Sequence, residues 1–442
     1  MKERIKSWVL TVLVALSVFL TWQLWTYEPE YDSLSEESTY APNEELGEER
    51  SLQDVVEPDQ LVIHNGERHA ALNATDDLFS SFYDDLLESR IDNLTLDQNF
   101  EDDELYDSPR AVEVIYPTPI PSEVMEQILN FEEDTPNLSL DTIDRILVQD
   151  GGGDTESLQV QFVSHEESFV LEGETNFSLS EFREQYILQM NDYTSVFGYE
   201  LENDASVTET IYLPEDPVTY NTLSDTSTEI DYNNFVGLLF SESDYVEQYR
   251  QDNQEASFTD GNRMMSVEEN GSYLTYVNPV YSENNTDSQN HVINTTFQFV
   301  NSRGGWNDHY RLYDWKEQSQ EDTSTYRMVV AGLPIFTSSG ADLTSINVSR
   351  SAGQVSEYSR PLFTLDDTPI DSRGSMELVS GQEVINYAED QFEPSQLEDF
   401  QVGYQMEKQD SLVVRFEPNW YVKYDGAWYP VNPKEAEETE EG

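Results

Sequence analysis

Residues 5–25 read IKSWVLTVLVALSVFLTWQLW, and this stretch decides how the rest of the chain is organised. It contains no ionisable side chain between Trp8 and Trp22. An α-helix rises about 1.5 Å per residue, so roughly 20 residues cover the ~30 Å hydrocarbon core of a bilayer. The stretch therefore predicts a transmembrane helix over residues 8–27.

The charges that flank this stretch predict its orientation. Lys2, Arg4 and Lys6 precede it, and the next basic residue is Arg50. Because basic residues accumulate on the cytoplasmic side of a span, residues 1–7 are expected in the cytoplasm. We expect a single-pass protein of the cell membrane whose bulk is extracytoplasmic.

A cleavable signal peptide is the alternative to an anchor. Such a peptide has a shorter apolar region that ends at a cleavage site of small residues. Residues 19–27 read FLTWQLWTY, which is mostly bulky. The sequence therefore favours an uncleaved anchor.

Charge is the strongest compositional signal. The chain has 89 acidic and 22 basic residues, for a net charge of -67. Nucleic acid is excluded as a partner, because its binding depends on cationic side chains that displace counterions. With 12% aromatic residues, the chain does not match a disordered acidic protein. We interpret the acidity as halophilic adaptation, since molar salt screens the self-repulsion of such a chain.

The sequence contains no cysteine. An exported protein without disulfides is typical of a Gram-positive cell surface rather than of a eukaryotic secretory route. The absence also excludes thiol catalysis and cysteine-ligated zinc.

The folded part is predicted to be α+β, with an N-terminal transmembrane helix followed by a three-domain extracytoplasmic part. Composition and turn signals place the boundaries as follows: an acidic stalk over 28–59, an N-terminal domain over 60–191, a central domain over 192–306, a C-terminal domain over 307–433 and an acidic tail over 434–442.

Hydrophobic spacing and helix caps predict the elements of the first domain. Thr75 is expected to cap a helix that buries one apolar stripe, and Ser122 to start a second helix. A hairpin is expected on either side of the glycine-rich tip at 151–154. Ser178 and Glu181 form a capping box that predicts a third helix.

The two later domains look alike in outline. Each is expected to carry one helix among strands: a helix over 242–251 with strands at 273–277 and 292–300, and a helix from the capping box at Ser380 to Phe392. Similar aromatic stretches, GSYLTYVNP at 271–279 and GAWYPVNP at 426–433, end the two blocks. We expect the two domains to be related by duplication.

No motif of catalytic chemistry occurs in the chain. The five histidines are expected to be surface imidazoles, and only His64 and His69 lie near one another in sequence. Residues 97–103 begin like a calcium loop but lack its glycine and final glutamate. We therefore predict a protein that is not an enzyme, with no catalytic residues, no cofactor and no metal site.

One face of the predicted span carries a different pattern. On a helical wheel, all of its small or hydroxylated residues occupy one half, and small residues let helices approach closely in lipid. The predicted partner-binding residues are Ser7, Thr11, Ala15, Ser17 and Thr21.

Four stretches resemble a known family. They are ERIKS at 3–7, LTWQLWTYEPEYD at 20–32, GQVSEYSRPLF at 353–363 and WYVKYDGAWYP at 420–430. They resemble the YycH (WalH) proteins of Bacillus-like Gram-positive bacteria. The resemblance implies a membrane-anchored regulator of the YycG (WalK) sensor histidine kinase, acting in a complex with YycI and affecting cell-wall homeostasis. It also implies three extracytoplasmic domains of which the last two are related.

An alternative function belongs to a different class. The chain would be an extracytoplasmic module that binds a ligand or a wall fragment, and its anchor would be passive.

Overall fold

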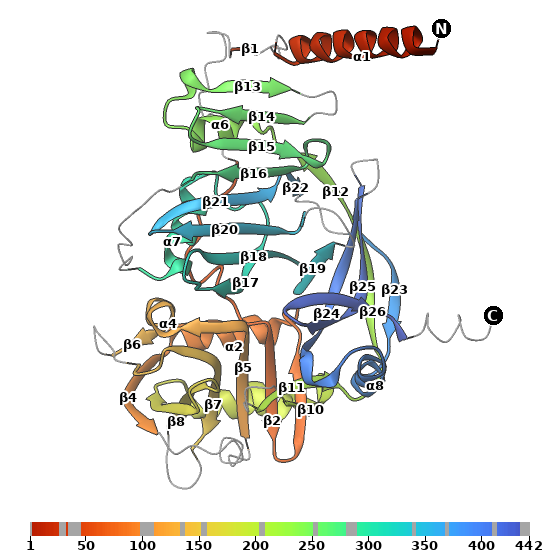
Figure 1. Ribbon diagram of the computed structural model, residues 1–442. Helices are drawn as coiled ribbons and strands as arrows, with labels where there is room; N and C mark the ends of the chain where they lie inside the picture. The colour runs from red at the N-terminus through yellow and green to blue at the C-terminus, as the bar shows by residue number, and fades with distance from the viewer. Residues whose placement is uncertain are drawn as a thin grey trace, which may run out of the picture.

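Two sheets, both mostly antiparallel, carry most of the computed structural model (Figure 1). The structure describes residues 2–25, 32–33, 46–97, 110–132, 138–151, 157–202, 208–250, 255–279, 290–337, 342–366, 371–408 and 413–433. Outside this range lie the expected acidic tail, most of the calcium-like stretch and the tip of the glycine-rich hairpin.

The first sheet has ten strands in the order β11-β10-β3-β2-β5-β7-β8-β9-β4-β6. Its strands are β2 Gln60–Asn65, β3 Arg68–Leu72, β4 Arg90–Asp97, β5 Arg110–Pro121, β6 Asn130–Phe131, β7 Thr142–Asp150, β8 Leu158–Ser164, β9 Phe169–Thr175, β10 Thr194–Glu202 and β11 Thr208–Pro214.

The second sheet has sixteen strands, and its main path is β1-β13-β14-β15-β16-β21-β20-β18-β19-β24-β25-β12-β22. In chain order, its strands begin with β1 Asp32–Ser33, β12 Val218–Glu229, β13 Glu247–Arg250, β14 Ala256–Thr259, β15 Met264–Glu268, β16 Tyr273–Val277, β17 Tyr310–Lys316 and β18 Asp322–Val330. The rest are β19 Leu333–Thr337, β20 Ser345–Ser351, β21 Gln354–Pro361, β22 Phe363–Leu365, β23 Asp371–Leu378, β24 Leu397–Lys408, β25 Val413–Tyr424 and β26 Ala427–Val431.

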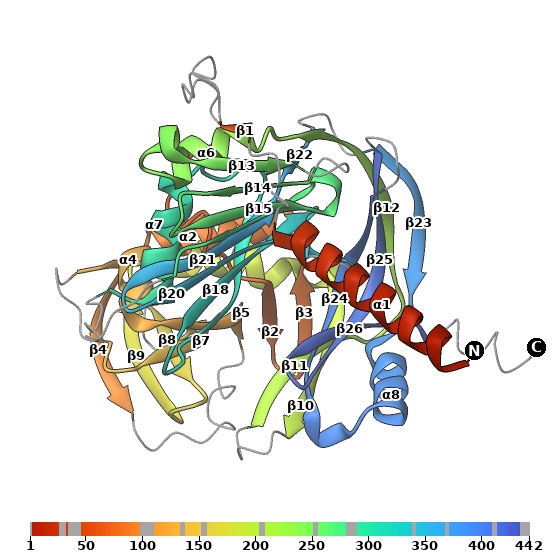
Figure 2. The same cartoon turned by 45° about the horizontal axis from the view of Figure 1, so that its top comes forward.

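The helices cover these sheets or lie at the ends of the molecule (Figures 1 and 2). They are α1 Lys2–Trp25, α2 Asp77–Glu88, α4 Ser122–Ile128, α5 Leu179–Glu181, α6 Asn233–Leu239, α7 Val292–Ser302 and α8 Gly381–Gln391. A π-helical turn, Phe182–Tyr186, and a 3-10 turn, Ile187–Asp192, extend α5.

Several expected helices are confirmed, with their buried faces. α2 buries Phe79, Phe82, Tyr83 and Leu86, although its N-cap is Asp76 and not Thr75. α8 has the complete capping box, in which the Ser380 side chain accepts from the Glu383 amide and the Glu383 side chain accepts from the Ser380 amide. In α8 the cap acts together with the buried face of Val384, Ile385 and Ala388, because burial of one face stabilises a helix that propensity alone would leave marginal.

Two expected elements are wrong. Residues 292–300 belong to α7 and not to a strand, because Val292, Thr296 and Val300 share the helix face that packs on β18, β20 and β21. The described residues 242–250 form no α-helix: a 3-10 turn at Ser243–Tyr245 leads into β13, which pairs with β14. In both places, packing and strand pairing override local propensity.

The expected domain limits do not coincide with sheet limits. β10 lies beyond residue 192 but pairs with β3 of the first sheet. The expected stalk also ends inside the fold, since Val55 and Val56 are buried in the main core. The division into three domains and the duplication stay predictions.

The expected span forms a helix, α1, at the end of the molecule where β1 and β13 lie (Figure 1). Within the residues that the structure describes, no helix is both long and apolar enough to cross a membrane.

Candidate functional site

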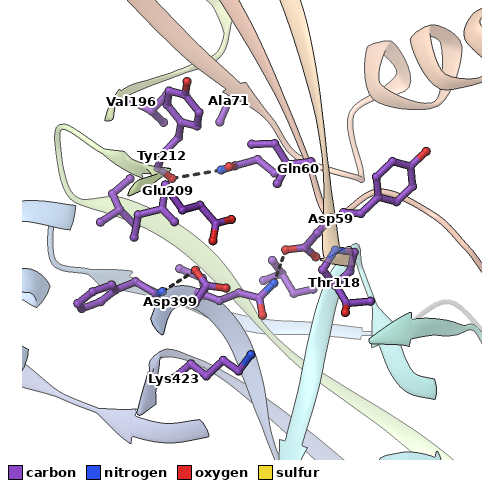
Figure 3. A pocket seen from close by; sticks show the side chains of 18 of the residues that line it. Asp59, Gln60, Ala71, Thr118, Val196, Glu209, Tyr212, Asp399 and Lys423 are labelled. Carbon is purple, nitrogen blue, oxygen red and sulfur yellow. Dashed lines mark hydrogen bonds between the residues drawn. The ribbon is translucent and has the colours of Figure 1, made fainter. Parts of the chain in front are cut away.

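A cavity of about 490 Å³ lies where the first sheet meets the C-terminal strands of the second (Figure 3). Strands β2, β5, β7, β10 and β11 contribute to one wall, and β24 and β25 contribute to the other. Figure 3 shows Glu209 of the first wall and Asp399 of the second beside the same space, with Asp59 and Lys423 around it. Six carboxylate side chains and two permanently cationic side chains line the cavity.

A buried arginine links the cavity to the interior of the first sheet. The Arg145 side chain on β7 is 1% exposed, and its Nη1 donates to Glu113 Oε1 at 2.5 Å. Its Nη2 lies 3.2 Å from Glu209 Oε1 and donates to the carbonyl oxygen of Thr210 at 2.5 Å. Burial opposes ionisation of Glu113, but the charge of Arg145 and the hydrogen bond from His64 lower its pKa to about 2.

Two histidines extend this chain of contacts. His64 and His69 face each other across the β2–β3 hairpin, with their Nδ1 atoms 2.7 Å apart. His64 Nε2 lies 3.0 Å from Glu113 Oε2. Burial, reinforced by His64, lowers the pKa of His69. The two-residue turn Gly66-Glu67 brings the two rings together, and Gly66 at its first position has the positive φ (+66°) that this class of hairpin turn requires.

The expectation that all five histidines are surface imidazoles is wrong. His64 is 3% exposed, and only His309 is classed as exposed. His165 bonds Asp144 at 2.6 Å, and this contact raises the pKa of His165 despite the opposing effect of burial. The His291 side chain accepts a hydrogen bond from the Ile293 amide and caps α7.

Asp399 differs from the other carboxylates around the cavity. It accepts a hydrogen bond from the Phe400 amide at 2.7 Å, and within the described part of the chain it forms no ion pair. The nearest candidate, Lys423, lies 3.4 Å from Glu398 instead. Burial, together with the negative charge of Glu209, raises the pKa of Asp399 to about 7.

Asp59 joins distant parts of the chain at the edge of the cavity. Its Oδ1 is 2.5 Å from Nη1 of Arg311 on β17, and Gln401 of β24 donates to its Oδ2. Burial raises the pKa of Asp59, and the charge of Arg311 opposes this shift. The two sheets are therefore joined here through a charged contact.

The volume of the cavity is that of a small-molecule site. Among the described residues, no three of His, Asp or Glu are grouped so that they could hold a metal. Aromatic side chains line much of the space, among them Tyr220, Tyr313, Trp420 and Trp428. Its eight charged side chains make the lining more polar than is usual for ligand sites of this size.

The residues predicted from the sequence as a partner face lie elsewhere. Ala15 and Ser17 are exposed on α1, and the side chains of Ser7, Thr11 and Thr21 lie outside what the structure describes. None of the five lines the cavity. Sequence reasoning missed the cavity because its six carboxylates are among 89 acidic residues in the chain. The one usable signal was the pair of histidines beside the Gly66-Glu67 turn.

The fold and the cavity define a mostly antiparallel α+β protein whose two sheets meet at a charged, aromatic-lined site. The chain belongs to the YycH family: "YycH protein, N-terminal domain" matches residues 3–185, and "YycH protein, C-terminal domain" matches residues 208–438. The family assignment expected from the sequence is thereby confirmed.

Two relatives from Bacillus subtilis match almost end to end. One is named "Two-component system WalR/WalK regulatory protein YycH" and is 21% identical over 451 residues, 97% of this chain and 96% of the relative. The crystal structure of YycH from Bacillus subtilis superposes with a TM-score of 0.71 at 17% identity, covering 87% of this chain and 98% of that one. The structural likeness supports the α+β fold.

Proposed function

We propose that this chain is a regulator of a two-component system, acting on its sensor histidine kinase without catalysis of its own. The observation that carries the proposal is the end-to-end match to a relative that is named a WalR/WalK regulatory protein. Models of both regions of the family match this chain, over residues 3–185 and 208–438.

The proposal includes a location and a mode of contact. The chain would be anchored in the cell membrane by α1, with its N-terminus in the cytoplasm and its sheets outside. It would act in a complex with the YycG/WalK kinase and YycI and affect cell-wall homeostasis. The apolar stretch between Trp8 and Trp22 and the basic residues before it support this placement.

Substitution of the predicted helix face tests the contact. Thr11→Leu together with Ala15→Leu should block close helix approach while leaving insertion intact, because leucine is favoured in the bilayer. Contacts between helices in lipid are worth about 0.6–2 kcal/mol each, so the loss of two should reduce regulation several-fold. The measurement is kinase autophosphorylation, with crosslinking between helices, after co-reconstitution of the chain with the kinase and YycI.

The matched control places leucine at Val9 and Val12 on the opposite side of the helical wheel. This double variant should regulate and crosslink as the unmodified chain does. If both double variants behave like the unmodified chain, the face is not a partner contact.

A second candidate function has its own support. The cavity favours a ligand-binding module whose anchor is passive. Replacement of residues 5–25 by an unrelated span distinguishes the two. Loss of kinase regulation supports the first function. Unchanged regulation by the swapped chain, together with its loss when the extracytoplasmic part is deleted, supports the second.

A further inference from the structure

The cavity between the sheets has an imbalance of charge at its centre. Glu209 is paired with Arg145, Asp59 with Arg311, and Glu398 with Lys423. Asp399 lies among these pairs and forms no ion pair of its own within the described residues. Because an uncompensated carboxylate in a partly buried site is costly, this position is suited to a cation from outside the chain.

The dimensions of the cavity decide what kind of cation fits. Metal ions bind protein oxygens at about 2.0–2.6 Å, and the residues that the structure describes offer no group of three such donors. The space of about 490 Å³ is much larger than one ion and lies in the range of small-molecule sites. An organic cation is therefore favoured over a bare metal.

The side chains that line the cavity indicate which organic cation fits. Tyr313 and Trp428 line the cavity on the face of β24 and β25 that carries Asp399 and Lys423, and their ring centroids lie 6.1 Å apart. An apolar stem can pack on these groups, and aromatic faces attract a nearby cation. Because Asp399 is a single carboxylate, the ligand that complements it best carries one compact positive charge at the end of its stem.

We propose that this cavity binds a primary ammonium group on an aliphatic stem, with Asp399 as its counter-ion and Glu209 beside it. The ion pairs Arg145–Glu209 and Arg311–Asp59 stabilise the walls of the cavity. Lys423 repels the positively charged ligand and limits its affinity. This inference does not depend on the proposed kinase regulation, since it concerns binding by the purified chain alone.

Calorimetric titration of the purified full-length chain with two matched probes tests the proposal. Nα-acetyl-lysine amide carries the ammonium group, and Nα-acetyl-norleucine amide has the same kind of stem without it. We expect saturable binding of the lysine probe at pH 8 and at least tenfold weaker binding of the norleucine probe. Equal binding of the two probes, or no binding of either, overturns the proposal.

Variants locate the site. Asp399→Asn should weaken binding of the lysine probe at least tenfold, whereas Asp390→Asn, an exposed change on α8, should leave it unchanged. Lys423→Gln should strengthen binding a few-fold, because it removes a competing positive charge. If Asp399 and Lys423 were only structural, their substitutions would not change the affinity for the lysine probe in opposite directions. An unchanged affinity in both Asp399→Asn and Lys423→Gln overturns the proposal.

A third set of titrations identifies the source of the amine. 1,5-Diaminopentane presents the same ammonium chemistry as a free diamine, and calcium chloride presents a divalent cation. Tighter binding of the lysine probe points to a peptide side chain, and tighter binding of the diamine points to a free amine; both outcomes support the site. Calcium binding that is lost in Asp399→Asn, with no amine binding, overturns the proposal.

Discussion

At the residue scale, the interior of the first sheet depends on charges that compensate one another. Glu113 and Arg145 are almost completely inaccessible, and His64 occupies the second carboxylate oxygen of Glu113. Breaking a buried ion pair is costly because the remaining charge is left without its partner in a low dielectric. These residues therefore stabilise the wall of the cavity and position Glu209 through Arg145.

Removal of the Glu113 charge should destabilise the fold strongly. Glu113→Gln leaves the buried Arg145 guanidinium without the carboxylate that lies 2.5 Å from its Nη1, and we expect the free energy of unfolding to fall by about 3–5 kcal/mol. Denaturant unfolding followed by tyrosine and tryptophan fluorescence measures the change. Glu184→Gln, at an exposed position, is the control and should change stability little. A loss of less than about 1 kcal/mol in Glu113→Gln would contradict this assignment.

Asp399 should make stability depend on pH in the opposite sense to most carboxylates. Its pKa is raised to about 7, so between about pH 4 and 7 the folded chain holds a proton that the unfolded chain has lost. Stability from this group is therefore present at low pH and is lost as the pH rises through 7. Asp399→Asn removes the cost of ionising this carboxyl group in the folded chain. The variant should be more stable than the unmodified chain by about 1–2 kcal/mol at pH 8, with little difference at pH 4.5.

Thermal melts of both proteins at the two pH values measure this difference. Nearby charges act in both directions, Glu209 and Asp59 raising the pKa of Asp399 and Lys423 lowering it. A stability difference that is the same at both pH values would show that Asp399 does not titrate in this range.

At the scale of elements, the sequence predicted those helices whose cap and buried face agree. The capping box of α8 and the apolar stripe of α2 are both local signals, and both are confirmed. α7 was mistaken for a strand because its β-branched residues favour strands, while its helical form depends on packing against three strands that lie later in the chain. Signals that arise only after folding are not available from local sequence.

The cavity was beyond prediction for the same reason. Asp59 and Gln401, which bond across it, are 342 positions apart in the sequence. Only strand order brings them together, and a parallel pairing between β19 and β24 is part of that order. Because acidic residues occur throughout the sequence, the sequence did not indicate which of them meet at the cavity.

The cap of α8 provides a prediction at this scale. Ser380→Ala removes the two hydrogen bonds of the hydroxyl, which accepts from the Glu383 amide and donates to the Glu383 carboxylate, and should cost about 1 kcal/mol of unfolding free energy. The backbone amide of residue 380 can still donate to Glu383. Hydrogen exchange of the first-turn amides of α8 should accelerate in parallel. Ser380→Thr retains a hydroxyl that can accept from the Glu383 amide and donate to its carboxylate, and should recover most of the loss; failure to do so would assign the effect to packing of α8.

At the scale of the whole molecule, the few cations are used inside the fold. Arg145, Arg311, Arg350 and Arg360 are each at most 5% exposed. The burial of these cations leaves the surface with even less positive charge than the ratio of 22 basic to 89 acidic residues suggests. Repulsion among surface carboxylates therefore opposes the compact state, and salt relieves it.

Stability should consequently rise with salt. The Debye length falls from about 30 Å at 0.01 M to about 3 Å at 1 M, so repulsion between surface carboxylates is screened while the buried ion pairs are affected much less. We expect the melting temperature of the chain to increase continuously from 0.01 M to 2 M sodium chloride. A variant with Glu88, Glu184 and Glu393 changed to Gln and Asp390 changed to Asn, all exposed positions, should melt higher at low salt and respond less to added salt. Sucrose, which strengthens burial without screening charge, separates the two causes. If the melting temperature is independent of sodium chloride, surface repulsion does not limit this fold and the halophilic interpretation of its acidity is wrong.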